Sequence, residues 1–232
     1  MKIISNDKLI ERNHKIGNII SIASVVILGV GMFYSFQDKD GSYLTLTFSA
    51  LIVGFILFQI STYYVNRFGK PPRPDQKLTQ ALKGLDDKYS LYHYMGGVSH
   101  LLVSPVGIYI LLPYNQVGAI SYNAEKGRWK QSGGNFFLKT FGGESLGRPD
   151  LDASYAINDL TRFCNKNGIN LGDSTPETIL VFINDKATVN TEGFEGLAVP
   201  AAKLKEAIRK NAKTKSVPTH ILDELHKKFD QK

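Results

Sequence analysis

Residues 16–37 read IGNIISIASVVILGVGMFYSFQ, and residues 41–66 read GSYLTLTFSALIVGFILFQISTYYVN. Neither stretch contains a charged side chain, and only Asp38-Lys39-Asp40 stands between them. Because an α-helix rises about 1.5 Å per residue, roughly 20 apolar residues cross the ~30 Å hydrocarbon core of a bilayer. The two stretches therefore predict a transmembrane hairpin of two helices, at about 17–36 and 43–64.

A cleaved signal peptide and a buried soluble hairpin both fit these apolar stretches less well. A signal peptide has an apolar core of about 7–15 residues, whereas the first stretch is longer and a second follows it at once. A hairpin buried inside a soluble domain remains as an alternative, although soluble core helices rarely exceed about 18 residues without a charge. Aromatic residues near the predicted ends, among them Tyr34, Tyr43 and Tyr63, are typical of a membrane interface.

Basic residues flank the predicted hairpin on the side of both termini. They are Lys2, Lys8, Arg12 and Lys15 before it, and Arg67, Lys70, Arg73 and Lys77 after it. The turn offers only Lys39, so the positive-inside rule predicts that both termini face the cytoplasm. We expect a two-span protein of a prokaryotic plasma membrane. The net charge of +7 partly reflects these flanks and is not by itself a nucleic-acid signal.

The rest of the chain predicts one α/β domain after a stiff linker. Residues 1–15 form a basic cytoplasmic segment, and prolines make residues 67–74 an extended linker. Residues 75–212 read in order as a helix, three strands, a helix, a strand and further helices. Within them the glycine-rich tract 127–149 predicts mostly loop. Residues 213–232 predict a basic C-terminal helix.

Several runs within this domain carry a resemblance to a known family. They are Asp75-Gln76-Lys77-Leu78, GGVSHLLVSPVGIYILLPYNQVGAI at residues 96–120, Trp129, Arg148-Pro149, TILVFIND at residues 178–185 and AVPAAKLKEAI at residues 198–208. In this order they resemble the nuclease-related domain (NERD), a branch of the restriction-endonuclease-like PD-(D/E)XK fold. The resemblance spans residues 75–212 and implies a mixed central sheet flanked by helices.

The same resemblance implies where an active site would lie. Active members of the fold carry a carboxylate on one central strand and Glu-x-Lys on the next, and the two acids hold the Mg²⁺ that polarises the scissile phosphate. Here Ser99 stands at the Asp position, Leu112 at the Glu position and Tyr114 at the Lys position. No carboxylate occurs in residues 89–124, so the domain is expected to be inactive, with no catalytic residue, metal or cofactor.

Residues outside these three positions offer less support for chemistry. Acids elsewhere could hold a displaced metal, but solvated surface positions or helix N-caps explain them better. These acids are Asp86, Asp87, Glu125, Glu144, Asp150 and Asp152. His93 and His100 could ligate a transition metal, but a histidine in a strand is more often a hydrogen-bonded core residue. The single cysteine, Cys164, lies on an apolar helix stripe and is expected to be a small core residue.

Three functions remain open on the sequence. The first is a protein-interaction platform, tethered by the hairpin to a membrane protein partner or a larger membrane complex. The second is a membrane-tethered nucleic-acid-binding protein without cleavage activity, because cations and aromatics alternate around Trp129. Its candidate binding residues are Lys126, Arg128, Trp129, Lys130 and Lys139. The third is residual metal-dependent hydrolysis through one of the displaced acids.

Overall fold

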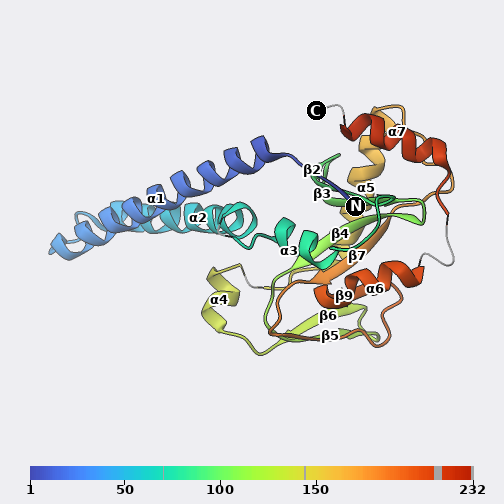
Figure 1. Cartoon of the computed structure of the whole chain (residues 1–232). Helices are drawn as coiled ribbons and strands as arrows, with labels where there is room; N and C mark the ends of the chain where they lie inside the picture. Colours follow the sequence, from blue (N-terminus) through green and yellow to red (C-terminus); the bar gives the residue numbers. More distant parts are fainter. Residues whose placement is uncertain (70, 144, 212–215, 231–232) are drawn as a thin grey trace. The chain divides into compact units, whose positions relative to one another are not determined.

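The computed structural model describes residues 1–69, 71–143, 145–211 and 216–230 (Figure 1). These residues fall into two compact units. The hairpin unit holds the described residues of Asp7–Arg73 together with Phe136–Gly143. The sheet unit holds Met1–Asn6, Pro74–Asn135 and the described residues of Glu144–Lys232.

Two long helices make up most of the hairpin unit, α1 (Asp7–Gln37) and α2 (Leu44–Phe68). Both are long and apolar enough to cross a membrane. The predicted pair of helices is therefore confirmed. Helix α1 begins at Asp7, ahead of the predicted span, because the residues before the apolar stretch include good helix formers such as Leu9 and Glu11.

Small residues let α1 and α2 approach each other closely. A Cβ atom added to Gly31 would lie 2.7 Å from the Cβ of Ala50, and one added to Gly17 would lie 2.8 Å from the Cβ of Tyr64. Such close approach is typical of helices that pack in lipid. The outward surface is apolar and includes Ile19, Ile22, Val25, Phe48 and Ile52.

The main sheet of the sheet unit has six strands in the order β1-β2-β3-β4-β7-β9. Their bounds are β1 (Lys2–Ser5), β2 (Ser90–Met95), β3 (Val98–Ser104), β4 (Gly107–Tyr114), β7 (Glu177–Phe182) and β9 (Leu197–Pro200). Strand β3 is antiparallel to both of its neighbours, and every other pair is parallel. The predicted α/β domain with a mixed sheet is confirmed.

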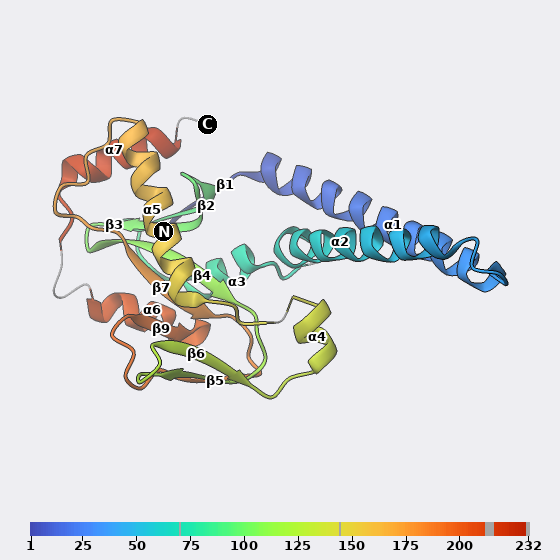
Figure 2. The ribbon, with the colours of Figure 1, turned by 180° about the vertical axis from the view of Figure 1, so that it is seen from behind.

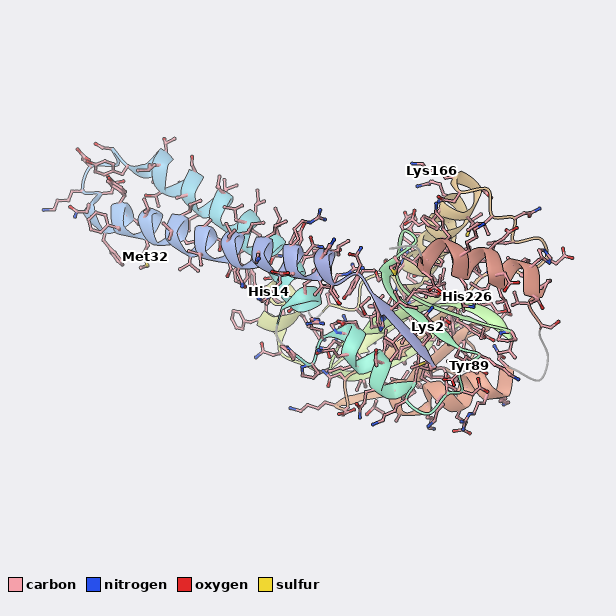
Figure 3. All side chains as sticks on the ribbon, turned by 45° about the horizontal axis from the view of Figure 1, so that its top comes forward. Lys2, His14, Met32, Tyr89, Lys166 and His226 are labelled. Carbon is pink, nitrogen blue, oxygen red and sulfur yellow. The ribbon has the colours of Figure 1, made fainter. Side chains whose placement is uncertain are left out.

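Strand β1 corrects the expectation that residues 1–15 are only a basic segment. Residues 2–5 form an edge strand, and Lys2 pairs in register with Ser90. Ile4 packs against the core, and the Lys2 Nζ forms an ion pair of 2.6 Å with Asp230. Figure 3 labels Lys2 on this strand and His226 on the neighbouring C-terminal helix. The four-residue strand was missed because it ends just before a long helical pattern begins.

Helices cover both faces of the main sheet. On one face, α5 (Pro149–Lys166) and α7 (Thr219–Asp230) pack on the core through Leu160, Cys164 and Leu225. On the other, α3 (Pro74–Ala81) and α6 (Ala201–Asn211) pack through Leu78 and Leu204. Helix α6 lies in front of the sheet in Figure 1, and α5 lies in front of it in Figure 2.

The C-terminal helix belongs to this domain. Four buried residues of α7 contact the core cluster beneath it: Ile221, Leu222, Leu225 and Phe229. Residues 213–215 and 231–232 of the predicted 213–232 helix lie outside the described residues, as do Lys70 of the predicted linker and Glu144. The expected Cys164 core position is also observed, since its side chain is fully buried.

A second, smaller sheet has the order β6-β5-β8. Its strands are β5 (Gly118–Asn123), β6 (Arg128–Ser132) and β8 (Ala187–Asn190). Strand β6 and the short helix α4 (Phe136–Phe141) fall within residues 127–149, which the sequence predicts mostly as loop. That expectation is wrong for both elements, because each is too short to show a recognisable period between its flanking glycines.

Candidate functional site

One end of the main sheet gathers most of the predicted site residues. Strands β1, β2, β4, β7 and β9 run the same way, so their carboxyl ends lie at one edge of the sheet, beside the start of antiparallel β3. In open α/β sheets this carboxyl edge is where ligands usually bind. Residues of a ligand site would therefore be expected at the ends of β2, β4 and β7 and at the beginning of β3.

The three positions implied by the nuclease resemblance share one face of the sheet. Strands β3 and β4 are in register with Leu101 opposite Ile110, and both residues belong to the core under α5 and α7. Side chains alternate along a strand, so Ser99, Leu112 and Tyr114 point to that same side. The structure brings these positions together, but a hydroxyl, a leucine and a phenol supply no anionic oxygen for a hard cation.

Tyr114 bonds to the helix above it. Its hydroxyl donates a hydrogen bond of 2.8 Å to the Oδ2 of Asp152, in the first turn of α5, and its ring packs against Phe182. Burial, and then the nearby negative charge of Asp152, raise the pKa of Tyr114 well above its ordinary value. Tyr114 therefore remains a neutral donor and cannot supply the positive charge of the lysine that it replaces in the resemblance.

Three of the acids considered for a displaced site have local partners: Asp87, Asp150 and Asp152. Asp150 pairs with Arg148 at 2.6 Å, which lowers the pKa of Asp150, and Arg148 rather than an aspartate occupies the N-cap of α5. The N-cap expectation for Asp150 and Asp152 is thus wrong. Asp87 accepts a hydrogen bond of 2.9 Å from the amine of Met1. Within the described part of the chain, no three histidine, cysteine or acidic side chains converge as a metal site would require.

The opposite face of the carboxyl edge holds a buried histidine pair. The Nδ1 atoms of His93 and His100 are 2.8 Å apart, and the Nε2 of His93 lies 2.9 Å from the Thr79 hydroxyl of α3. Each histidine is only 1% exposed. One Nδ1 must carry a hydrogen and the other must accept it, so the bonded pair cannot hold a proton on both Nδ1 atoms. This arrangement agrees with core residues that satisfy one another.

The sequence carries a signal for this pair in two adjacent glycines. Gly96 and Gly97 both have positive φ, of 67° and 79°, as a two-residue type I′ hairpin turn requires. A turn at those positions sets the register so that His93 lies opposite His100. Reading the glycine pair as the tip of a hairpin would have predicted the contact.

The predicted nucleic-acid-binding set is only partly brought together. Lys126, in the β5–β6 turn, and Arg128 and Lys130, two residues apart on β6, are exposed on the same hairpin. Trp129 points the other way and is buried against Phe182 and Phe194, with its ring unavailable for stacking on a base. Lys139 lies on α4, which belongs to the hairpin unit rather than to the sheet unit.

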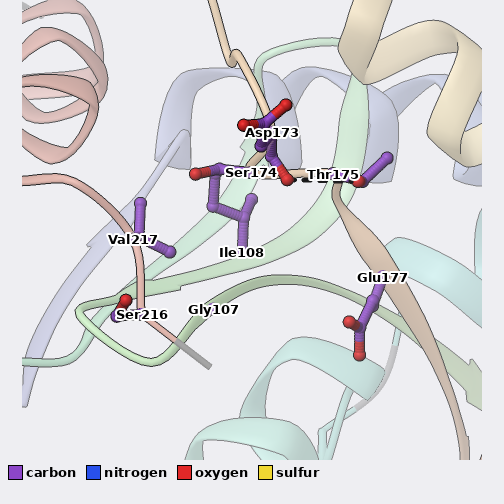
Figure 4. A pocket seen from close by; sticks show the side chains of 8 residues that line it. All are labelled: Gly107, Ile108, Asp173, Ser174, Thr175, Glu177, Ser216 and Val217. Atoms are coloured by element: carbon purple, nitrogen blue, oxygen red, sulfur yellow. Dashed lines mark hydrogen bonds between the residues drawn. The ribbon is translucent and has the colours of Figure 1, made fainter. Parts of the chain in front are cut away.

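Sequence reasoning missed a pocket at the amino ends of β4 and β7. It has a volume of about 250 Å³ and is lined by Gly107, Ile108, Asp173, Ser174, Thr175, Glu177, Ser216 and Val217 (Figure 4). Two carboxylates and three hydroxyls line it without a cationic side chain among these residues. The only indication of this pocket in the sequence is the cluster of polar residues before β7.

A larger hollow, of about 500 Å³, lies in the hairpin unit where α1 begins and α2 ends. Its lining includes two acids, Asp7 and Glu11, together with His14 and Arg73. Comparison of the chain with models of known families, with curated proteins and with solved structures finds no match.

Proposed function

We propose that this chain is a membrane-anchored, catalytically inactive nuclease-like protein that serves as an interaction platform or accessory subunit of a membrane complex. The observation that carries this proposal is the shared face of Ser99, Leu112 and Tyr114. All three side chains point to one side of β3 and β4, where an active member of the resembled fold would need two carboxylates and a lysine. The domain keeps the positions of such a site without its chemistry.

The anchor is the α1–α2 hairpin, with both termini in the cytoplasm of a prokaryote and the hairpin in its plasma membrane. The flanking cations support this topology. Strand β1 supports it too, because β1 and β2 pair in one sheet and must therefore lie in the same compartment. The segments before α1 and after α2 then emerge on one side, as an even number of spans requires.

The proposed role as an interaction platform or accessory subunit can be tested in native membranes. The tagged full chain is extracted with mild detergent, separated on blue-native gels and analysed by quantitative mass spectrometry. We expect one complex of fixed stoichiometry, recovered equally when the tag is moved to the partner that the spectrum identifies. A monomer in every mild detergent would overturn the accessory-subunit proposal.

A nuclease assay tests the proposal that the domain is catalytically inactive. The full chain in nanodiscs is incubated with single- and double-stranded DNA and RNA, with Mg²⁺ or Mn²⁺. We expect no cleavage above that of a sample with chelator. Metal-dependent cleavage that an Asp152→Asn substitution abolishes would instead establish a displaced active site.

A second candidate function is nucleic-acid binding through the exposed cations of the β5–β6 hairpin. Each phosphate contact contributes about 0.9 to the slope of log affinity against log salt on duplex DNA. Replacing Lys126, Arg128 and Lys130 with alanine should therefore lower that slope by up to about 2.7. The matched control replaces Lys166, Lys227 and Lys228, which are exposed on α5 and α7. Equal slopes for the two triple variants would exclude this surface.

A further inference from the structure

Helix α4 is part of the hairpin unit although the chain on either side of it belongs to the sheet unit. Three contacts join this segment to α2. The ring of Phe141 lies edge-on to that of Phe55, with 5.9 Å between centroids. The Nδ2 of Asn66 donates a hydrogen bond of 2.9 Å to the carbonyl of Gly142. A Cβ atom on Gly143 would lie 3.4 Å from the Cγ2 of Thr62, so the backbone there runs against α2.

These contacts cover about half of the length of α2. Phe55 and Asn66 are eleven residues apart, which corresponds to about 16 Å along a helix axis. Arg67 follows directly and marks the basic end of the predicted span. The segment therefore follows α2 from its polar end to the level of Phe55, within the part that the proposed anchor places in the bilayer.

The composition of α4 suits this position. Its sequence is FFLKTF, with one cation and no acid. The side chains of Phe136 and Phe137 are 71% and 69% exposed, and the ring of Phe137 stacks on that of Phe141. Exposed adjacent phenylalanines that continue an apolar helix surface are typical of a lipid contact. A lysine such as Lys139 can lie along such a surface with its charge at the headgroups.

We propose that residues 136–143 form a third membrane-embedded element, inserted in the cytoplasmic leaflet beside α2, with Phe136 and Phe137 in contact with lipid acyl chains. This inference rests on the proposed anchoring by α1 and α2. The occupant of the exposed apolar surface is lipid because the surface continues the outward face of α2. The segment ties the sheet unit to the membrane at a second point of the chain, since residues 135 and 145 both continue into that unit.

The experiment uses a fluorescent nitrobenzoxadiazole label on single introduced cysteines in the full chain, reconstituted in nanodiscs with and without nitroxide-labelled lipid. Burial raises the pKa of the native Cys164 thiol to about 11, so Cys164 stays unlabelled at neutral pH and needs no replacement. The test variant is Phe136→Cys. The controls are Ile52→Cys, on the outward face of α2, and Tyr155→Cys, exposed on α5.

We expect nitroxide lipid to quench the label at position 136 several-fold more than the label at position 155, and to a degree similar to position 52. Quenching at 52 without quenching at 136 would overturn the inserted α4 and leave the anchor intact. Absence of quenching at both positions would overturn the anchor itself. A blue-shifted label at 136 that lipid does not quench would place α4 against protein, which also overturns the inference.

Discussion

His93 and His100 show how two buried polar side chains can form a hydrogen bond with each other. Replacing either side chain removes the 2.8 Å hydrogen bond between the two rings at a site where both are buried. An unsatisfied buried donor or acceptor costs about 1–3 kcal/mol. The pair is therefore a stability element of the carboxyl edge, whatever the domain binds.

We predict that His93→Leu and His100→Leu each lower the free energy of unfolding by about 1–3 kcal/mol, and that the double variant loses less than the sum. The single Trp129 is buried in the sheet unit and gives a fluorescence signal for its unfolding in detergent. His220→Leu changes an exposed histidine of α7 and serves as the control. Additive losses would show that the two histidines are not coupled.

Tyr114 gives a prediction at alkaline pH. The folded chain holds the phenol proton to a higher pH than the unfolded chain does, because burial and Asp152 raise the pKa of Tyr114. Above about pH 10 the unfolded state therefore binds fewer protons, and stability falls as the pH rises. Tyr114→Phe should cost about 1 kcal/mol at pH 7 and should flatten the alkaline loss. Tyr155→Phe, at an exposed tyrosine, should leave the loss unchanged when melting is followed from pH 7 to 11.

At the scale of elements, the close packing of α1 on α2 depends on particular glycines. A Cβ on Gly31 would meet Ala50 at 2.7 Å, whereas nothing lies within 4 Å of one on Gly29. We predict that Gly31→Val destabilises the hairpin by about 1–3 kcal/mol through overpacking and that Gly29→Val is near neutral. Pulse proteolysis over a series of SDS concentrations in mixed micelles measures both. Equal effects at the two glycines would mean that α1 and α2 do not pack through Gly31.

Elements with a long period or a continuous apolar run, such as α5 and β7, were predictable, whereas β1, β6 and α4 were not. The apolar stretches and the stripe of α5 repeat over many residues, so helix and face follow from sequence alone. β1, β6 and α4 have six residues or fewer, too few to show a period. For the same reason, the burial of Trp129 and the placement of Lys139 could not be predicted. The burial of Trp129 depends on β6, and the placement of Lys139 depends on α4.

At the scale of the whole molecule, the sheet unit contains residues from both sides of the hairpin. We predict that a soluble version with residues 1–6 joined to residue 74 through a long Gly/Ser linker melts higher than one that starts at residue 74. A difference of about 2 kcal/mol corresponds to roughly 4–8 °C for a domain of this size. In the joined version, Ile4→Asn should remove the gain, because Ile4 packs on the core, and Ile3→Asn should keep it, because Ile3 is 47% exposed. Identical melting of both versions would show that β1 adds no stability.

The carboxyl edge shows where prediction from the sequence ends. The family resemblance implied positions at Ser99, Leu112 and Tyr114, and the structure has them on the neighbouring strands β3 and β4. Their local partners were not predictable, because the bond between Tyr114 and Asp152 joins residues 38 positions apart and depends on how α5 crosses the sheet. The association of α4 with α2 likewise joins distant segments and has no local signal.

The position of strand β1 in the chain also determines when the main sheet can be completed during biosynthesis. Lys2 leaves the ribosome 88 residues ahead of Ser90, the residue it pairs with, and the whole of α1 and α2 is translated in between. If the hairpin is anchored as proposed, the first strand stays unpaired in the cytoplasm until the hairpin has entered the bilayer. A chain whose N-terminus crossed the membrane by error could not pair β1 with β2. Correct insertion would therefore be a condition for completing the sheet.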